Sequence, residues 1–137
     1  MALPGGHADE DDDGPLDTAF RELEEELGIP PSQVEVIGTT GHFQTTNHVD
    51  IQVFAGLWNG KGPIRFETNE IARVLKIPLK DLFQTHVASN FHGSDPDMTN
   101  LIYPFMDVEI WGATARILHH FIELMYPLFE SEFNNSD

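Results

Sequence analysis

The sequence predicts an α/β protein in which a mixed β-sheet lies between helices, an α/β/α sandwich. Apolar residues repeat with a helical period near both ends of the chain, and the segments between them alternate with the two-residue period of a strand. A chain of 137 residues is long enough for one domain with a substantial core. We therefore expect a single domain over residues 1–130, followed by a polar tail over residues 131–137.

The first helix is predicted from Pro15 to Leu27. Proline suits the first helical position, where a backbone N–H has no helical partner, and Gly28 is a natural helix stop. Acidic residues just before Pro15 favour a helix N-terminus, because the helix dipole is positive there. One side of this helix carries an apolar stripe that should face the core. The stripe consists of Leu16, Ala19, Phe20, Leu23 and Leu27.

A second face of the same helix is acidic, because Glu22, Glu25 and Glu26 fall within one arc of about 100°. Like charges three and four residues apart cost about 0.2–0.5 kcal/mol per pair, and the helix C-terminus prefers cations. A bound divalent cation would reverse both penalties, since hard cations bind carboxylate oxygens. Arg21, one turn before Glu25, could hold that carboxylate in place. The alternative is a solvated acidic face on an acidic protein.

The remaining elements follow from the same patterns. Residues 48–58 show the clearest alternation of the two-residue period. A final helix is expected over residues 111–129, with its last turns bent by Pro127, and a frayed polar tail from Phe129 onward. The other predicted strands cover 33–40, 72–77, 85–91 and 100–108, and a short helix covers 78–83.

Composition and charge narrow the function. The formal net charge is −16, so nucleic acid or an anionic membrane is not an expected partner without a metal ion. A phosphate substrate would need bound divalent cations to offset this charge. The absence of cysteine excludes disulfides, a thiol nucleophile and a thiolate metal site. The apolar runs are too short to span a bilayer and no secretory signal is found, so we expect a cytoplasmic protein.

One stretch carries a specific motif. Residues 21–29, Arg-Glu-Leu-Glu-Glu-Glu-Leu-Gly-Ile, match every fixed position of R-E-U-x-E-E-x-G-U, where U is aliphatic. This string resembles the second half of the Nudix box of hydrolases that act on nucleoside diphosphates linked to another moiety. In the first half, G-x5-E-x7, Gly6 fits, but Asp12 replaces the glutamate and lies one residue further from Arg21 than the pattern specifies.

These departures resemble the coenzyme A pyrophosphatase branch of the family. The Pro-Pro-Ser-Gln-Val-Glu-Val-Ile-Gly continuation over residues 30–38 is also similar to that branch. The resemblance extends through residues 69–71 and 77–79 to 111–115, so it covers most of the chain.

The resemblance implies a metal-dependent site on an α/β/α sandwich. Mg²⁺ or Mn²⁺ would be bound by Glu22, Glu25, Glu26 and the carbonyl of Gly6. Arg21 and Gly28 would support the site. The catalytic candidates are Glu22, Glu25 and Glu70, and either Glu22 or Glu70 would act as the base.

The implied activity is hydrolysis of a small-molecule diphosphate. Coenzyme A or an acyl-CoA is the favoured substrate, cleaved to adenosine 3′,5′-bisphosphate and (acyl-)4′-phosphopantetheine. A different dinucleotide or nucleotide sugar is an alternative. A second alternative is a catalytically impaired binding module. Family members carry a strand before the glycine loop, the loop that here contains Gly5 and Gly6, and members of this branch carry a further motif there. Their absence would leave a sheet edge open, which a homodimer could cover.

Two features near the end of the chain have simpler explanations. His119 and His120 are adjacent, so they face different directions, and a metal pair on one helix face needs i,i+4 spacing. We do not expect both to bind one metal ion. Tyr103 and Phe105 could stack on an adenine, although aromatic residues in strands commonly serve packing alone.

Overall fold

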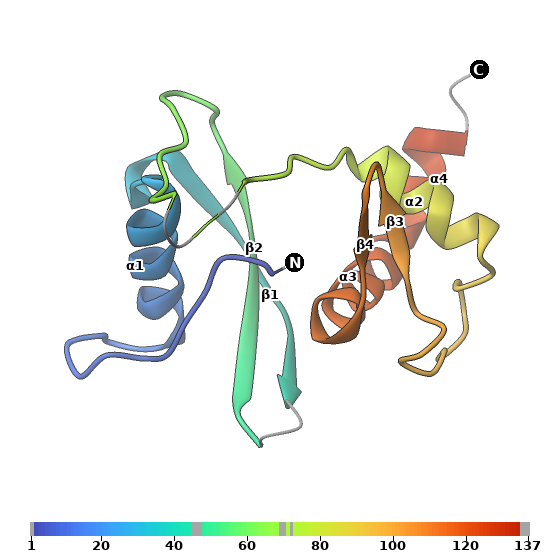
Figure 1. Cartoon of the computed structure of the whole chain (residues 1–137), viewed down its shortest axis with the longest axis horizontal. Coiled ribbons are helices and arrows are strands. Elements are labelled where there is room, and N and C mark those ends of the chain that lie inside the picture. Colours follow the sequence, from blue (N-terminus) through green and yellow to red (C-terminus); the bar gives the residue numbers. More distant parts are fainter. Residues whose placement is uncertain (1, 45–47, 69–70, 72, 135–137) are drawn as a thin grey trace. The chain divides into compact units, whose positions relative to one another are not determined.

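The computed structural model describes residues 2–44, 48–68, 71 and 73–134. The chain forms two compact units. The N-terminal unit contains Ala2–Gln44 and Val49–Leu75, and the C-terminal unit contains residues 76–134. In chain order the elements are α1 (Pro15–Leu27), the 3-10 helix η1 (Pro31–Gln33), β1 (Val34–Gln44), β2 (Asp50–Trp58), α2 (Leu79–Ala88), β3 (Tyr103–Phe105), β4 (Val108–Ile110), α3 (Gly112–Leu124) and α4 (Tyr126–Asn134) (Figure 1).

In the N-terminal unit, α1 has the bounds that the sequence predicts. Pro15 occupies the first turn, and Gly28 ends the helix at a left-handed φ of 69°. The Gly28 N–H donates to the carbonyl of Glu24 at 2.9 Å. Most of the predicted apolar stripe is half-buried, Leu16 is exposed, and the following Ile29 is buried. Local signals therefore set both ends of this helix.

The same unit holds the β1–β2 hairpin, which lies beside α1 (Figure 1). The strands pair antiparallel, from Val34 opposite Trp58 to Gln44 opposite Asp50, with two irregularities in β1. The strand predictions over 33–40 and 48–58 are confirmed. The first of these strands continues further than predicted, to Gln44.

The C-terminal unit is built from three helices and the short β3–β4 hairpin. Phe83 on α2 lies at its centre, with ring centroids 5.3 Å from Tyr126 and 6.1 Å from Phe129. Within the described ranges, no helix is both long and apolar enough to cross a membrane. The buried core consists of Leu82, Phe83, Phe91, Leu101, Tyr103, Ile110, Ala115, Ile122 and Phe129.

Four local predictions are wrong in this half of the chain. The segment 100–108, predicted as one strand, holds β3 and only the first residue of β4, with a turn at residues 106–107 between them. The segment 85–91, predicted as a strand, forms the end of α2 and a turn, because Leu82, Phe83 and His86 bury one helical face. Residues 73–77 form no strand. The chain does break near Pro127, which lies in the first turn of α4, where proline is tolerated. The predicted frayed tail is instead helical through Asn134, since Phe129 is buried in the core.

The α/β class is confirmed, and the strands that the structure describes form two separate antiparallel pairs. Each pair joins strands that are neighbours in sequence, with only residues 45–49 between β1 and β2 and residues 106–107 between β3 and β4. Parallel pairing needs a crossover of a dozen or more residues, so such short connections permit only antiparallel hairpins.

Two described residues of the C-terminal core, His86 and Tyr103, form a buried polar pair. His86 and Tyr103 are both fully buried, and His86 Nδ1 lies 2.9 Å from the Tyr103 hydroxyl. Burial lowers the pKa of His86 and, with the nearby Glu123 carboxylate, raises the pKa of Tyr103. The hydrogen bond offsets the desolvation of both groups, as buried polar atoms require.

Candidate functional site

The acidic face predicted from the sequence is present on α1. Glu22, Glu25 and Glu26 all belong to this helix, with Glu22 and Glu26 half-buried and Glu25 exposed. The loop over residues 5–13 runs beside them and supplies both backbone and side-chain partners. The site is therefore formed by one helix and the loop that leads into it.

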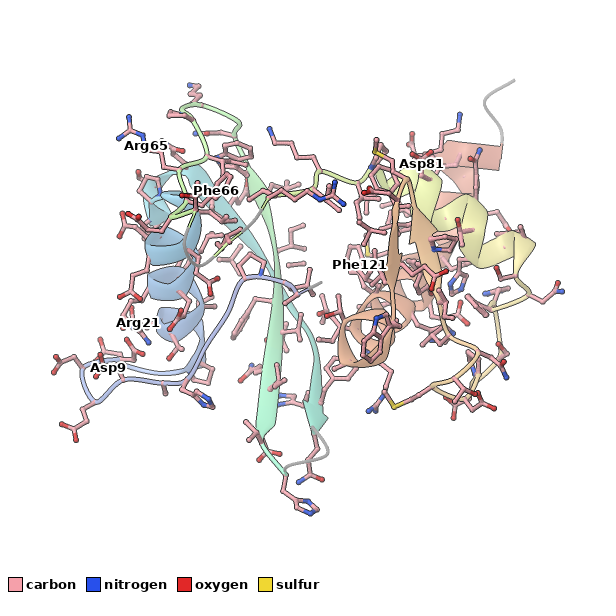
Figure 2. All side chains as sticks on the ribbon, viewed as in Figure 1. Asp9, Arg21, Arg65, Phe66, Asp81 and Phe121 are labelled. Carbon is pink, nitrogen blue, oxygen red and sulfur yellow. The ribbon has the colours of Figure 1, made fainter. Side chains whose placement is uncertain are left out.

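Arg21 is the centre of the hydrogen bonds in this region. Its Nη1 donates to Glu22 Oε1 and to Glu25 Oε2, both at 3.1 Å. Its Nη2 donates to the carbonyl of His7 at 2.9 Å, and its Nε to Asp12 Oδ1 at 3.0 Å. Figure 2 shows Arg21 projecting from α1 toward the loop that carries Asp9. One guanidinium thus connects three carboxylates and the backbone of the loop.

Asp12 is the buried partner of this arginine, with a side chain only 4% exposed. It binds Arg21 through both carboxylate oxygens and accepts a hydrogen bond from the Thr18 hydroxyl at 2.9 Å. The Arg21 guanidinium and the other hydrogen bonds lower the pKa of Asp12 to about 2, and Asp12 raises the pKa of Arg21. From the sequence, the acidic residues before Pro15 were expected to stabilise the helix N-terminus through the helix dipole, and the ion pair between Asp12 and Arg21 was not predicted.

The glycine loop contacts the acidic face directly. The Gly5 N–H donates to Glu26 Oε2 at 3.1 Å. At Gly6 an added methyl group would lie 2.5 Å from the Glu22 carboxyl carbon. A side chain at this position would force the Glu22 carboxylate away from the backbone of residue 6. The structure therefore brings the predicted residue Gly6 against the predicted residue Glu22.

Gly28 has a structural role at the opposite end of α1. A Cβ at this position would lie 3.1 Å from Arg65 Cβ, and the positive φ would strain any other residue. The Arg65 N–H donates to the carbonyl of Leu27 at 2.8 Å. Gly28 thus lets the chain that follows β2 pack on the end of the helix.

The predicted metal ligands on α1 do not lie close enough together in this structure to form a ready-made ion site. Among the described residues, the one trio of His, Asp or Glu side chains whose ligand atoms lie within 4.8 Å of one another is His86, His119 and Glu123 in the C-terminal unit. The three glutamates of α1 form no such trio. Glu70, the other candidate base, lies outside the described residues.

The donor set on α1 nevertheless fits a hard divalent cation. Mg²⁺ and Mn²⁺ favour carboxylate and carbonyl oxygens, and the predicted ligands Glu22, Glu25, Glu26 and the Gly6 carbonyl offer only such oxygens. Arg21 contacts one oxygen of Glu22 and one of Glu25, so the second oxygen of each can still bind an ion. The exposed position of Glu25 leaves access from solvent.

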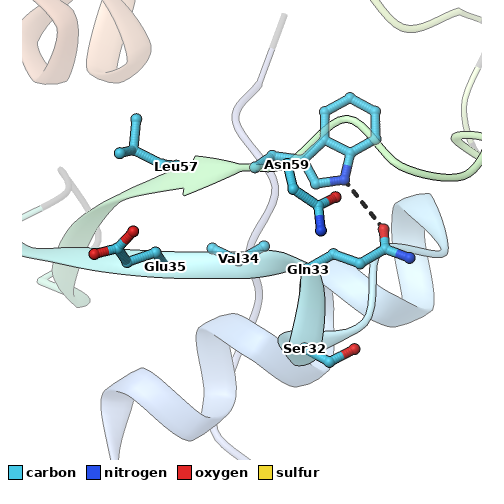
Figure 3. A pocket seen from close by; sticks show the side chains of 7 residues that line it. Ser32, Gln33, Val34, Glu35, Leu57 and Asn59 are labelled. Atoms are coloured by element: carbon cyan, nitrogen blue, oxygen red, sulfur yellow. Dashed lines mark hydrogen bonds between the residues drawn. The ribbon is translucent and has the colours of Figure 1, made fainter.

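Among the described residues, the N-terminal unit includes the following two pockets. One, of about 280 Å³, is formed where β1 begins and β2 ends, and Trp58 Nε1 donates there to Gln33 Oε1 at 3.2 Å (Figure 3). The other, of about 450 Å³, lies between the start of α1 and β2, with Phe20 and Phe54 in its wall. Neither is lined by Glu22, Glu25 or Glu26.

Comparisons with known proteins agree with the motif on α1. The model of the NUDIX domain family matches residues 1–99. Similar relatives include proteins named "Uncharacterized Nudix hydrolase NudL" from Yersinia pestis (strain Pestoides F) and Yersinia pseudotuberculosis serotype O:1b (strain IP 31758). Each is 32% identical over 125 residues. The match covers 88% of this chain and 61% of each relative, so the chain spans less than two thirds of their length.

The Asp12–Arg21 pair predicts a specific pH dependence. Because the pKa of Asp12 falls from 3.8 to about 2 in the folded chain, its stabilising contribution is complete above pH 3.8. That contribution is lost as the pH falls through about 2. We expect an NMR titration of the Asp12 carboxyl carbon to show the low value in the wild type and a clearly higher one in Arg21→Gln. Arg65→Gln serves as the matched control, and an unchanged midpoint in Arg21→Gln would contradict the pairing.

Proposed function

Because the chain belongs to the Nudix family, we propose that it is a divalent-cation-dependent hydrolase of a nucleoside diphosphate linked to another moiety. The observation that carries this proposal is the Nudix-box helix α1, whose Arg21 holds two carboxylates of the acidic face while the glycine loop packs against it. An acidic helix C-terminus without a cation is unfavourable, so a bound ion accounts for a pattern that local physics opposes.

The proposed ion ligands are the carboxylates of Glu22, Glu25 and Glu26, together with the Gly6 carbonyl. Mg²⁺ or Mn²⁺ held there would neutralise the diphosphate and lower the pKa of a bound water. The close approach of Gly6 to Glu22 supports the inclusion of that carbonyl. The hydrogen bond from Gly5 to Glu26 supports the inclusion of Glu26, because it fixes this carboxylate beside the same loop.

Arg21 acts in this proposal as a positioning residue. Its Nη1 holds Glu22 and Glu25 at equal distances of 3.1 Å, which reduces the repulsion between them and limits their rotamers. Either Glu22 or Glu70 would orient or deprotonate the attacking water, since both are carboxylates available for general base catalysis. Gly28 supports the site indirectly by ending α1 where the chain packs against it.

Coenzyme A or an acyl-CoA is the substrate that we favour. Asp12 and its spacing from Arg21 resemble the coenzyme A pyrophosphatase branch, and the structure gives this aspartate a direct bond to Arg21. The products would be adenosine 3′,5′-bisphosphate and (acyl-)4′-phosphopantetheine. The net charge of −16 favours a small-molecule substrate that arrives with its cation over a nucleic acid.

Removing either of two carboxylates should abolish turnover. Glu25→Gln and Glu26→Gln each keep the shape of the side chain but weaken a metal ligand. We expect activity to fall at least about 100-fold, because losing a group that merely orients a ligand already costs about 10- to 100-fold. Circular dichroism should show an unchanged fold. Glu24→Gln, on an exposed part of the same helix, is the matched control and should retain activity. Near-normal rates in both Glu25→Gln and Glu26→Gln would contradict the ligand assignment.

Product analysis tests the reaction and the substrate together. The purified chain is incubated with Mg²⁺ and, separately, coenzyme A, ADP-ribose, NADH and diadenosine polyphosphates, and the products are separated by chromatography. We expect adenosine 3′,5′-bisphosphate from coenzyme A, and none when EDTA is present. Metal-dependent cleavage of another compound alone would retain the hydrolase and reject the substrate. No cleavage by a folded chain would favour a binding module instead.

A further inference from the structure

A second cluster of metal-ligating side chains lies in the C-terminal unit, separate in sequence from the acidic face of α1. It consists of His86 on α2 and His119 and Glu123 on α3, whose ligand atoms all lie within 4.8 Å of one another. His86 is fully buried, and the other two are half-buried. We propose that these three residues form a binding site for a zinc-type transition-metal ion.

The α3 helix presents two of the ligands on one face. His119 and Glu123 are four residues apart, the spacing that places side chains one turn above each other. His120, the adjacent histidine, is exposed and points elsewhere. The prediction from sequence weighed only the His119/His120 pair and therefore missed this arrangement, whose recognisable signal was the i,i+4 spacing of histidine and glutamate.

His86 completes the trio from α2. Its Nε2 lies 3.2 Å from Glu123 Oε2, close to the separation of about 3.4 Å between two ligands of a tetrahedral zinc ion with bonds of about 2.0–2.1 Å. Its Nδ1 lies 2.9 Å from the Tyr103 hydroxyl. A hydroxyl both donates and accepts, so Tyr103 can also bond to the tautomer whose Nε2 lone pair binds a metal.

His119 is held in a suitable tautomer. Its Nε2 lies 3.0 Å from the carbonyl of Phe91, which can only accept, so that nitrogen carries the proton. The lone pair of the neutral ring is then on Nδ1. Metal-binding histidines characteristically donate their other N–H to a backbone carbonyl or carboxylate, which fixes the ring and its tautomer.

The Glu123 carboxylate is also held from outside the trio. The backbone N–H of Gly93 donates to Oε1, and His92 Nδ1 lies 2.7 Å from Oε2. The His92 ring stacks on Tyr126, with centroids 3.4 Å apart, which keeps it at the rim of the cluster. These contacts orient the carboxylate.

The donor chemistry selects the kind of ion. Two imidazoles and one carboxylate are the three-ligand set of many zinc sites that keep a fourth position for water. Mg²⁺ prefers an all-oxygen shell, so it should not compete here. The chain would then have two cation sites of different chemistry, one on α1 and one between α2 and α3.

Cobalt and zinc binding to the full chain test this proposal. Apo protein is titrated with Co²⁺ in excess Mg²⁺, which leaves oxygen-only sites occupied, and binding is followed by visible absorption. We expect one equivalent of Co²⁺ with a nitrogen- and oxygen-ligand spectrum, displaced by Zn²⁺. In His119→Gln the affinity should fall at least about tenfold, whereas His120→Gln, the adjacent control, should bind like the wild type.

A second readout on the wild type covers the case of a variant that does not fold. NMR of the histidine ring protons should show that Zn²⁺ shifts the signals of His86 and His119 and leaves that of His120 in place. The proposal is overturned by the absence of saturable Co²⁺ binding in excess Mg²⁺. Equal affinities in folded His119→Gln and His120→Gln, or Zn²⁺ shifts confined to other histidines, would overturn it as well.

Discussion

The candidate site depends on the hydrogen bonds of the Arg21 guanidinium. This group binds Asp12 and the His7 carbonyl on the loop side, and Glu22 and Glu25 on the helix side. The Asp12 side chain is almost fully buried, so removing Arg21 would leave this carboxylate without a charged partner and with only its hydrogen bonds from Thr18 and Asp9, which is destabilising. Because one rigid planar group makes all these bonds, the loop and the acidic face keep a fixed relation to each other.

Charge explains why this site stands out from the rest of the chain. Elsewhere in α1 the local rules agree with the fold: proline begins the helix and glycine ends it. On the acidic face they conflict, because like charges gather near the negative end of the helix dipole. Such conflicts between local preference and structure are expected at functional sites. A bound cation resolves this conflict in the proposed function, and the Arg21 bonds reduce it within the chain itself.

Features set by neighbouring residues could be predicted from the sequence, and features set by distant packing could not. The bounds of α1 follow from its caps, and the presence of β1 and β2 follows from the sequence pattern, whereas the end of β1 at Gln44 does not. The segment 85–91 has strand-like composition, yet it belongs largely to α2 because that helix buries Phe83 and His86 in a core built from later residues. The Asp12–Arg21 pair depends on the path of a loop. The cluster of His86, His119 and Glu123 depends on the packing of α2 against α3, and His86 and Glu123 are 37 residues apart in sequence.

The binding of Mn²⁺ to Arg21→Gln, followed by electron paramagnetic resonance, tests the central role of this arginine most directly. Removing a positive charge beside a cation site would by electrostatics alone strengthen Mn²⁺ binding. If Arg21 positions the ligands Glu22 and Glu25, binding should instead weaken, at least about tenfold, as when other groups that orient metal ligands are removed. Unchanged or tighter Mn²⁺ binding by a folded Arg21→Gln chain would contradict the positioning role.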